Sequence, residues 1–497
     1  MGEEVKQTEF SRAHRQEYRR KVQLCLDVFE TLLKQSGPSQ TSFEFDRPLT
    51  GMEIECNLVD SEYQPAMSNS DVLASIADPA YQTELGAYNI EFNVPPRPLP
   101  GTSGLELEAE VRASLNAAET KANSSGAHIV MIGILPTLMP EHLAADWMSE
   151  STRYQALNDS IFTARGEDIM IDINGPERLS LQSPSIAPES ACTSMQLHLQ
   201  VSPEDFADNW NAAQVLAGPQ LALGANSPYF YGHQLWSETR IELFAQATDT
   251  RPDELKSQGV RPRVWFGERW ITSIFDLFEE NVRYFPSLLP EVSDEDPIAE
   301  LAGGRTPKLS ELRLHNGTVY RWNRPVYDVV NGRPHLRVEN RVLPAGPTVI
   351  DMMANSAFYY GMLRTLSEED RPVWTKLSFA AAESNFMSAA RDGMDARLYW
   401  PGEGEVTPDE LVLRRLLPMA DEGLRRWGVA AEVRDRFLGV IEGRAKTGQT
   451  GASWQVATVR ALQERGLARP QALAEMLRLY CQRMHSNEPV HTWDGPS

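Results

Sequence analysis

The sequence predicts an α+β fold in which antiparallel strands come first and helices come last. Short segments that alternate apolar and polar residues with period two recur between residues 50 and 343. From about residue 348 onward the chain is rich in Ala, Leu, Arg and Glu, a composition typical of helices. The chain shows no internal repeat and no long low-complexity tract. Strands followed by helices indicate an α+β layout rather than an alternating α/β one.

Residue periodicity places the individual elements. Residues 10–36 form a predicted helix, because Val22, Leu26, Phe29 and Leu33 recur at helical spacing. The next elements along the chain follow from alternation in strands and from an apolar stripe in one further helix. They are strands at 50–59, 88–94, 127–135, 193–201 and 335–343, and a helix at 104–122.

Prolines and glycines set two boundaries. The strand at 88–94 is expected to end at Pro95-Pro96, because proline has no N–H to donate to a strand ladder. In the helical part, a Gly/Pro-rich loop is expected at 401–408.

Four of the predicted strands carry polar side chains on one face and apolar side chains on the other. The polar residues are Glu53 and Glu55, then Glu91 (with Glu84 seven residues before it), then Gln196 and His198, and finally Arg337, Glu339 and Arg341. Any one such strand is explained by a solvated sheet face. If all four belong to one sheet, at least four carboxylates lie together and require cations to stay ionised.

Composition excludes several classes of function. The chain has 497 residues, 41% of them hydrophobic, which suits a soluble protein of two to three domains. A net charge of −22 argues against nucleic acid, which binds basic surfaces. No apolar run is long enough to span a membrane, so a membrane is not an expected partner. The four cysteines form no CxxC, which favours a reducing, cytoplasmic location without zinc sites or disulfides.

The polar strand faces indicate a particular chemistry. Carboxylate oxygens with an amide or imidazole beside them suit Mg²⁺ or Mn²⁺ better than zinc. The interspersed Arg337 and Arg341 could hold phosphate or carboxylate groups through paired hydrogen bonds. Several cations together with arginines form the arrangement that phosphoryl transfer requires. The sequence contains no GxxxxGK[ST] motif, so metals and arginines rather than a glycine-rich loop are expected to bind the phosphates.

The order of these motifs resembles the glutamate–cysteine ligase family, in particular its bacterial type-2 branch, within the glutamine synthetase/guanidino-kinase superfold. The resemblance covers roughly residues 50–350, and its motifs are specific in their joint order rather than singly. The matching stretches are GMEIE at 51–55, ELGAYNIEFNVPPRPL at 84–99, TSMQLHLQV at 193–201, GANSPYFYG at 224–232, LRLHNGTVYRWNRPVYD at 312–328 and RPHLRVENRVLPAGPT at 333–348.

The resemblance implies an antiparallel sheet that forms a funnel-shaped active site flanked by helices. ATP would enter one end and the acceptor carboxylate the other. The implied organisation is an N-terminal helix at 1–45, a glutamine synthetase-like catalytic domain at 46–360, and a mainly helical region at 361–497 that packs on it. The implied cofactors are ATP and two or three Mg²⁺ or Mn²⁺ ions.

Site residues carry over position by position. Glu55, Glu84 and Glu91 match the ligands of one metal, and Glu53 and Glu339 match those of a second. The implied catalytic residues are Arg341, which would steady the transferred phosphoryl group, Arg240, a further anion-binding arginine in SETRIEL, and Glu91. For Arg341, pairing with a neighbouring carboxylate to hold the sheet together is the alternative.

One strand departs from the family pattern. Many relatives have His-x-His where this chain has Gln196-Leu-His198, and the first His binds metal. Plant-like relatives are similar to a Gln-x-Asn version, so Gln196 and His198 are joint metal-ligand candidates. The substrate-binding candidates are Arg337, Arg324, Trp322, Asn226 and Arg153. A turn at Asn226 and core packing of Trp322 are the structural alternatives.

The function expected from this resemblance is ATP-dependent joining of a carboxylate to an amine. An acyl phosphate, γ-glutamyl phosphate for glutamate, would form first and would condense with an amine such as cysteine. The alternatives are a ligase of the same superfold with a different acid or amine, and a catalytically silent nucleotide-binding protein. The expected partners are amino acids and ATP, and a homo-oligomer is compatible with the sequence.

Overall fold

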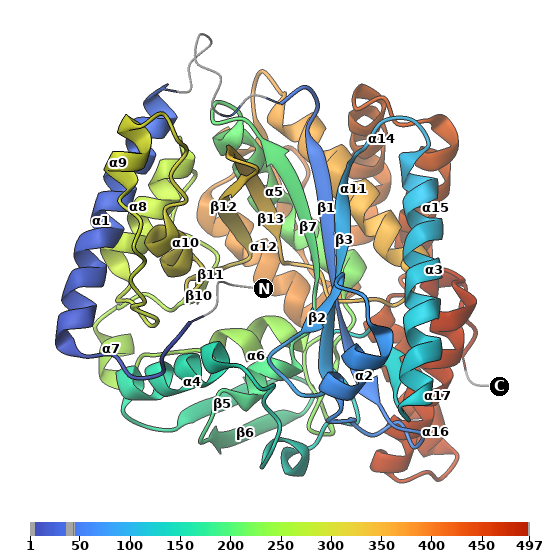
Figure 1. The fold of residues 1–497 in the computed structure, drawn as a ribbon. Coiled ribbons are helices and arrows are strands. Elements are labelled where there is room, and N and C mark those ends of the chain that lie inside the picture. Colours follow the sequence, from blue (N-terminus) through green and yellow to red (C-terminus); the bar gives the residue numbers. More distant parts are fainter. Residues whose placement is uncertain (1–4, 36–42, 44, 496–497) are drawn as a thin grey trace.

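A seven-stranded antiparallel sheet forms the centre of the molecule in the computed structural model, which describes residues 5–35, 43 and 45–495 (Figure 1). Its strand order is β12-β13-β7-β1-β3-β2, and β4 also pairs with β1. The strands are β1 (Leu49–Val59), β2 (Tyr81–Thr83), β3 (Asn89–Pro98), β4 (His128–Val130), β7 (Met195–Val201), β12 (Asn323–Val330) and β13 (Arg333–Asn340).

The pairing register gathers the polar side chains on one face of the sheet. Glu55 lies directly opposite Glu91, and Glu53 lies opposite Gln196. His198 lies opposite Glu339 across the next pair of strands. Because side chains alternate along a strand, these residues share a face and the intervening apolar residues share the other.

Two buried helices cover the apolar face of the sheet. These are α5 (Phe206–Gly224) and α11 (Val349–Ser367), which pack on each other and contact β13 and β7, respectively. The Tyr360 hydroxyl of α11 donates to the backbone carbonyl of His198 at 3.1 Å. The Trp210 indole of α5 donates to the carbonyl of Asn323 at 2.9 Å. The polar face is thereby left as the side on which a site can form.

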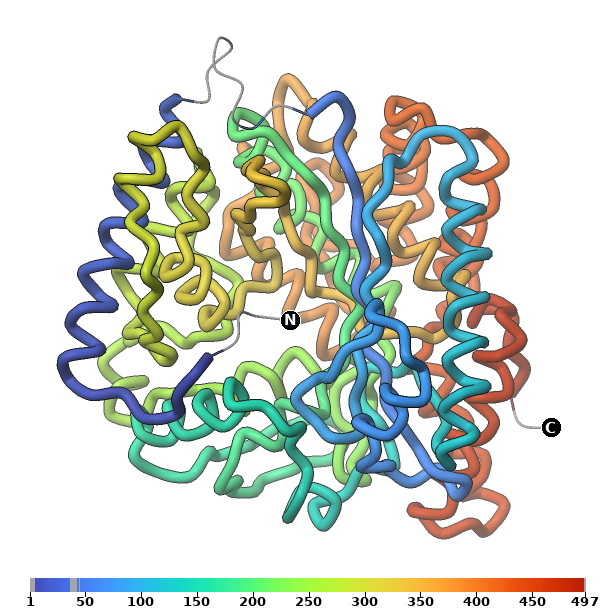
Figure 2. Tube along the Cα trace, in the orientation of Figure 1, coloured from blue at the N-terminus to red at the C-terminus, as the bar shows by residue number. Residues whose placement is uncertain are grey.

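Two groups of helices flank the sheet. One consists of α1 (Arg12–Gln35), α8 (Ile274–Tyr284), α9 (Pro297–Ala302) and α10 (Ser310–Asn316), where Phe29 packs edge-on against Phe278 and Tyr327. The other brings α3 (Ser103–Ser124) beside the C-terminal helices (Figure 2). There Arg436 pairs with the carboxylate of Glu108. These C-terminal helices are α14 (Leu417–Arg426), α15 (Ala431–Thr447), α16 (Gly451–Glu464) and α17 (Arg469–Ser486).

The remaining elements close the polar face or connect the larger ones. The helices are α2 (Asn69–Ile76), α4 (Thr152–Arg165), α6 (Thr239–Ala247), α7 (Asp253–Ser257), α12 (Phe379–Asp392) and α13 (Pro408–Leu411). The short strand pairs are β5 (Ile169–Asn174) with β6 (Arg178–Ser183), β8 (Tyr229–Phe230) with β9 (His233–Gln234), β10 (Val264–Trp265) with β11 (Tyr320–Arg321), and β14 (Leu398–Trp400) with β15 (Gly404–Val406). Short helical turns are η1 (Pro140–Leu143), η2 (Ala187–Ala191), η3 (Val373–Thr375), η4 (Gly393–Asp395), η5 (Val412–Leu416) and η6 (Val490–Thr492).

The α+β prediction is confirmed, with an antiparallel sheet, flanking helices and a helical C-terminal part. The predicted helix at 10–36 corresponds to α1, and residue 36 lies outside the described residues. Within the expected loop at 401–408, the chain forms β15 and pairs it with β14.

Three of the strand boundaries were wrong. The strand expected at 335–343 ends at Asn340, so Arg341 follows β13 rather than lying within it. β3 does not stop at Pro95 but continues to Pro98. The pairing of β3 with β1 shifts in register between Thr50 and Met52. Pro95 and Pro96 lie at this bulge, where no backbone N–H is needed from them. The strand expected at 127–135 is limited to β4, because the following backbone carbonyls bond elsewhere. The carbonyl of Ile132, for example, accepts from the Asn57 amide at 3.1 Å.

No helix of the described residues combines the length and apolar character needed to cross a membrane.

Candidate active site

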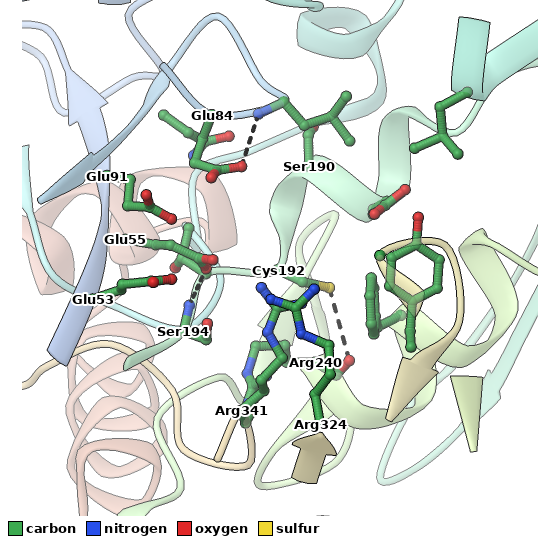
Figure 3. A pocket seen from close by; sticks show the side chains of 18 of the residues that line it. Glu53, Glu55, Glu84, Glu91, Ser190, Cys192, Ser194, Arg240, Arg324 and Arg341 are labelled. Carbon is green, nitrogen blue, oxygen red and sulfur yellow. Dashed lines mark hydrogen bonds between the residues drawn. The ribbon is translucent and has the colours of Figure 1, made fainter. Parts of the chain in front are cut away.

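A cavity of about 210 Å³ lies on the polar face of the sheet. Strands β1 and β3 form its floor, and α4, η2, α6 and the segment around β11 contribute its walls. In Figure 3 the labelled glutamates gather on one side, and three arginine side chains reach toward them. The sequence-predicted residues that line the cavity are Glu53, Glu55, Glu84, Glu91, Arg153, Arg240, Trp322, Arg324, Arg337 and Arg341.

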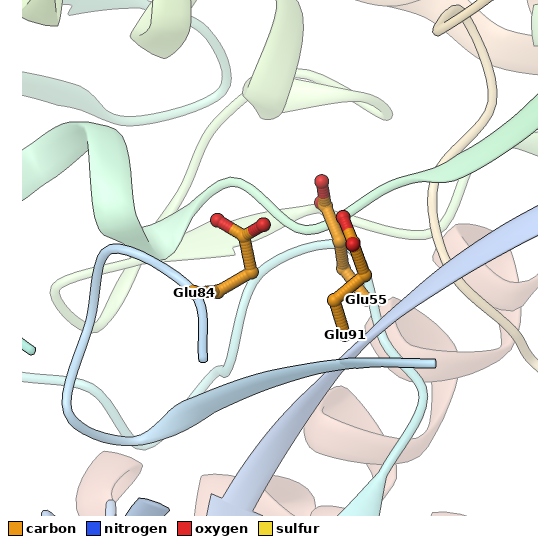
Figure 4. Close-up of side chains that lie close together, drawn as sticks. All are labelled: Glu55, Glu84 and Glu91. Carbon is orange, nitrogen blue, oxygen red and sulfur yellow. The ribbon is translucent and has the colours of Figure 1, made fainter. Parts of the chain in front are cut away.

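Three carboxylates converge at one end of the cavity (Figure 4). Glu55 comes from β1, Glu91 from β3, and Glu84 from the loop that joins β2 to β3. Each offers a carboxylate oxygen that lies within 4.8 Å of the others. The Glu91 carboxylate also accepts a hydrogen bond from Asn93 at 2.8 Å. We refer to these three residues as the acidic cluster.

The acidic cluster is electrostatically strained. Burial raises the pKa of Glu55 to about 7, although Arg341 opposes the shift, and the neighbouring Glu91 adds to it. Burial also raises the pKa of Glu84 well above its usual range, and the charges of Glu91 and Glu55 raise it further. Glu55 and Glu84 therefore favour the protonated form unless a cation neutralises them.

A fourth carboxylate, that of Glu53, lies in the cavity beside a histidine. The Glu53 carboxylate lies 3.1 Å from Nε2 of His198. Burial opposes ionisation of Glu53, but the charge of His198 and its hydrogen bond outweigh burial and lower the pKa. On its other side, Nδ1 of His198 lies 3.1 Å from Nε of Arg337. Both ring nitrogens of His198 therefore face protein groups as the side chains lie.

Glu339 is neutralised by two arginines. Arg324 donates to both of its carboxylate oxygens, at 3.0 and 2.7 Å, and Nε of Arg341 lies 2.7 Å from one of them. Burial opposes ionisation, but the charges of Arg324 and Arg341 lower the pKa of Glu339 to about 2. A cation could reach Glu339 only if one arginine turned away. We refer to these three residues as the arginine pair site.

Gln196 links the two sites. Its side-chain nitrogen donates to Glu55 at 2.8 Å, and its oxygen accepts from Arg341 at 3.1 and 3.0 Å. Gln196 is fully buried. As placed, its amide orients a carboxylate of the acidic cluster and a guanidinium of the arginine pair site, and its oxygen is already occupied by Arg341.

Hydrogen bonds hold the side chain of Arg240 next to the arginine pair site. Its guanidinium donates to Glu238 at 2.9 Å and to the backbone carbonyls of Arg341 and Val342. It also lies 5.6 Å from the ring centre of Trp322, a cation–π distance. Arg240 therefore holds the backbone that follows β13 while its side chain lines the cavity.

Asn226 is the substrate-binding candidate that the structure places away from the cavity. It is fully buried, and its side chain donates to the Ala345 carbonyl and to the Tyr480 hydroxyl, both at 2.8 Å. Its oxygen accepts from Gln455 at 2.9 Å. These bonds connect the end of α5 to the C-terminal helices.

Several cavity residues were not identified from the sequence. They include Leu157, Glu189, Phe244, Tyr320 and Arg321. Glu189 lies in the short turn η2, where no period of two or 3.6 residues marks a face. The sequence feature that could have indicated Glu189 was its position four residues before the strand-like segment at 193–201.

The donor set fits a divalent cation. Three carboxylates whose oxygens lie within 4.8 Å of one another gain most from a doubly charged ion, and oxygen ligands suit Mg²⁺ or Mn²⁺. Among the described residues, this cluster meets the geometry for a site of three or more ligand residues.

Known proteins resemble this chain in sequence profile and in fold. The profile of glutamate-cysteine ligase family 2 (GCS2) matches residues 49–482. A search of curated protein sequences found no significant match. A glutamate–cysteine ligase from Francisella tularensis, solved in complex with AMP, is 13% identical, with a TM-score of 0.53 over 90% of this chain and 91% of that chain. A bifunctional glutathione synthetase from Pasteurella multocida is also 13% identical, over 93% of this chain and 55% of that one, with a TM-score of 0.49. At such identity the first likeness shows a shared fold.

Proposed function

The chain belongs to glutamate-cysteine ligase family 2, and from this premise we propose that it is an ATP-dependent carboxylate–amine ligase. The family match confirms the resemblance found in the sequence motifs and indicates a ligase. The proposed reaction converts a carboxylate, with glutamate as the first candidate, into an acyl phosphate. The acyl phosphate then condenses with an amine such as cysteine.

The acidic cluster facing three arginines inside one cavity supports this proposal most strongly. Glu55, Glu84 and Glu91 would hold a divalent ion, and Glu53 would contribute to a second. When bound, such ions neutralise the charge on phosphate oxygens and lower the barrier to transfer. Arg341 and Arg324 lie across the cavity and supply fixed positive charge for the transferred phosphoryl group or for a substrate carboxylate.

In the first step, the substrate carboxylate attacks the γ-phosphorus of ATP and ADP leaves. Arg341 stabilises the charge spread over the transferred oxygens, and Gln196 holds its guanidinium in place. Arg240 fixes the backbone from which Arg341 projects. The walls formed by Tyr320 and Trp322, both less than 10% exposed, limit water access to the acyl phosphate.

In the second step, the amine attacks the acyl carbon and phosphate leaves, which forms an amide. Arg337 and Arg153 line the same cavity and are proposed to bind the anionic groups of the substrates. The chain's contribution is mainly positioning and electrostatic stabilisation, as expected for phosphoryl transfer.

Two alternatives remain distinct from this proposal. A ligase of the same superfold with another acid or amine would keep the acidic cluster and change the cavity walls. A catalytically silent nucleotide-binding protein has no need of the cation ligands, whereas this chain retains Glu53, Glu55, Glu84 and Glu91 in one cavity.

The cytoplasm is the proposed location. The four cysteines Cys25, Cys56, Cys192 and Cys481 are all free thiols, which suits a reducing compartment. A homo-oligomer, which is compatible with the sequence, stays a prediction.

A screen of amino acid pairs for ADP formation tests the proposed reaction. Purified protein, ATP and Mg²⁺ are incubated with glutamate and each candidate amine, and the product is identified by mass. We expect ADP rather than AMP, an amide product and dependence on both substrates. Glu91→Gln serves as the inactive control. ATP hydrolysis that ignores the amino acids, or none with any pair, would contradict the proposal.

A further inference from the structure

One cavity carboxylate has no role in the reaction described above. Glu189 lies in η2, and its side chain lines the cavity. The turn is rigid, because the Glu189 N–H donates to Ile186 and its carbonyl accepts from Cys192, at 2.8 and 2.9 Å. Its Oε2 atom is buried and has no hydrogen-bond partner among the described residues. A fixed backbone thus presents an unsatisfied carboxylate oxygen to the cavity.

Other buried carboxylates of this fold are satisfied by the protein itself. Glu238 accepts from Arg240 and from the Asn226 backbone, and Asp351 accepts from Arg444. Glu311 accepts two bonds from Ser293. Leaving a buried carboxylate oxygen without a donor is costly, so an orphaned carboxylate oxygen on a residue that lines the cavity indicates an external donor at Glu189.

The surroundings of Glu189 favour a singly charged donor over a metal ion. Glu189 is not part of the acidic cluster, in which three carboxylates supply ligand oxygens within 4.8 Å of one another. The cavity walls also include the rings of Tyr154, Phe244 and Tyr320. Burial raises the pKa of Tyr320, and the charge of Glu189 raises it further, which indicates that the carboxylate and this ring are neighbours. Burial raises the pKa of Glu189 to about 8, the charge of Arg341 opposes this shift, and the charge of Glu55 adds to it. A cation that reaches Glu189 beside these rings favours its ionised form, and an organic ammonium group suits this environment.

We propose that Glu189 binds the ammonium group of the amine that the enzyme acylates. The inference rests on the proposed ligase function and names the amine-binding end of its cavity. Glu189 is separate from the cation ligands, so the amine would approach the acyl phosphate from the aromatic side. The recognised chemistry is a primary ammonium, as carried by an amino acid or a simple alkylamine.

The test compares the wild type with Glu189→Gln, which keeps the side-chain size and removes the charge. Binding of L-cysteine, L-alanine and ethylammonium is measured by calorimetry with Mg²⁺ and a non-hydrolysable ATP analogue present. We expect at least one amine to bind the wild type and to bind the variant about 10- to 100-fold more weakly, because a charge-assisted hydrogen bond is lost. N-acetyl-L-cysteine, which lacks the ammonium, is expected to bind both proteins equally weakly.

Turnover gives a second readout. Glu189→Gln should raise KM for the amine by a similar factor and leave KM for ATP within about twofold. Glu150→Gln, an exposed carboxylate just before α4, is the matched control and should change neither. ATP-analogue binding with wild-type affinity shows that the variant is folded.

Two outcomes overturn the inference: no amine binds the wild type, or Glu189→Gln binds amines as the wild type does. Failure of the ligase proposal is recognised separately. In that case no amino acid pair yields ADP in the wild type, whereas the calorimetric comparison still reports whether Glu189 binds an ammonium group.

Discussion

The acidic cluster and the arginine pair site occupy the same sheet face but balance charge in opposite ways. Glu339 is ionised because Arg324 and Arg341 neutralise it, and its pKa falls to about 2. Glu55 and Glu84 have raised pKa values, because burial and mutual repulsion act on them together. Glu339 is neutralised within the chain, and the acidic cluster is proposed to be neutralised by a cation. A carboxylate count alone would not separate them.

The largest expected effect is the loss of stability in Glu339→Gln. Removing this charge leaves two arginines without their shared carboxylate, and breaking a buried pair costs about 3–5 kcal/mol. Urea unfolding measures the free energy. Glu300→Gln is the control, because Glu300 pairs with Arg305 at the surface and its loss should change the stability little. Equal losses in both variants would contradict the neutralised state of Glu339.

Arg341→Lys should reduce kcat by about 10²–10³, because lysine keeps the charge but not the planar fork that meets Gln196. KM values should change much less, since the contact strengthens in the transition state. Steady-state kinetics with the substrates found in the screen provide the measurement. If kcat stays near the wild-type value while the melting temperature falls, Arg341 only holds the sheet through Glu339.

Glu84→Gln tests whether repulsion among its carboxylates destabilises the acidic cluster. Neutralising one of three repelling carboxylates should raise the melting temperature of the metal-free protein, by about 1–3 °C. Mg²⁺ should then stabilise the variant less than it stabilises the wild type, because a ligand is missing. Calorimetric scans in EDTA and in Mg²⁺ give both numbers. A lower melting temperature with an unchanged Mg²⁺ response would show that repulsion does not dominate the cluster.

The pH dependence of stability should have opposite signs at the two sites. The folded-state pKa of Glu55 is about 7, above the unfolded value of 4.5, so its contribution is present at low pH and is lost as pH rises from 4.5 to 7. The folded-state pKa of Glu339 is about 2, so its contribution is lost as pH falls from 4.5 toward 2.

The difference between the wild type and Glu55→Gln isolates the first of these contributions. In EDTA, urea unfolding between pH 5 and 7 should show a slope of at most about 1.4 kcal/mol per pH unit that the variant lacks. Saturating Mg²⁺ should remove this slope. A slope of the opposite sign would mean that Glu55 is ionised without a cation.

Strand alternation was sufficient to predict the polar sheet face. Glu53, Glu55, Glu91 and Glu339 occupy one face because side chains alternate and the register aligns them. Alternation carries no information on which arginine meets which carboxylate. The pairing of Glu339 with Arg324 depends on the register of β12 with β13. The two-residue turn Asn331-Gly332, with both residues at positive φ, fixes that register, but the strand pattern alone did not use this signal.

Residues outside regular strands were predicted less well. Glu84 lies in a loop, and only the family resemblance placed it with the acidic cluster. Glu189 was missed, because a short turn has no side-chain period. Asn226 was expected at the substrate, but its side chain bonds to α17 through Tyr480, a contact between segments 254 residues apart. Tertiary contacts of this kind cannot be derived from local pattern.

Binding of Mn²⁺, followed by electron paramagnetic resonance, tests most directly whether the acidic cluster is a cation site. Wild-type protein should bind Mn²⁺, and Mg²⁺ should compete for the same site. The double variant Glu55→Gln/Glu91→Gln should bind at least about tenfold more weakly, whereas Glu300→Gln should bind as the wild type does. Equal Mn²⁺ binding by the wild type and the double variant would contradict the account.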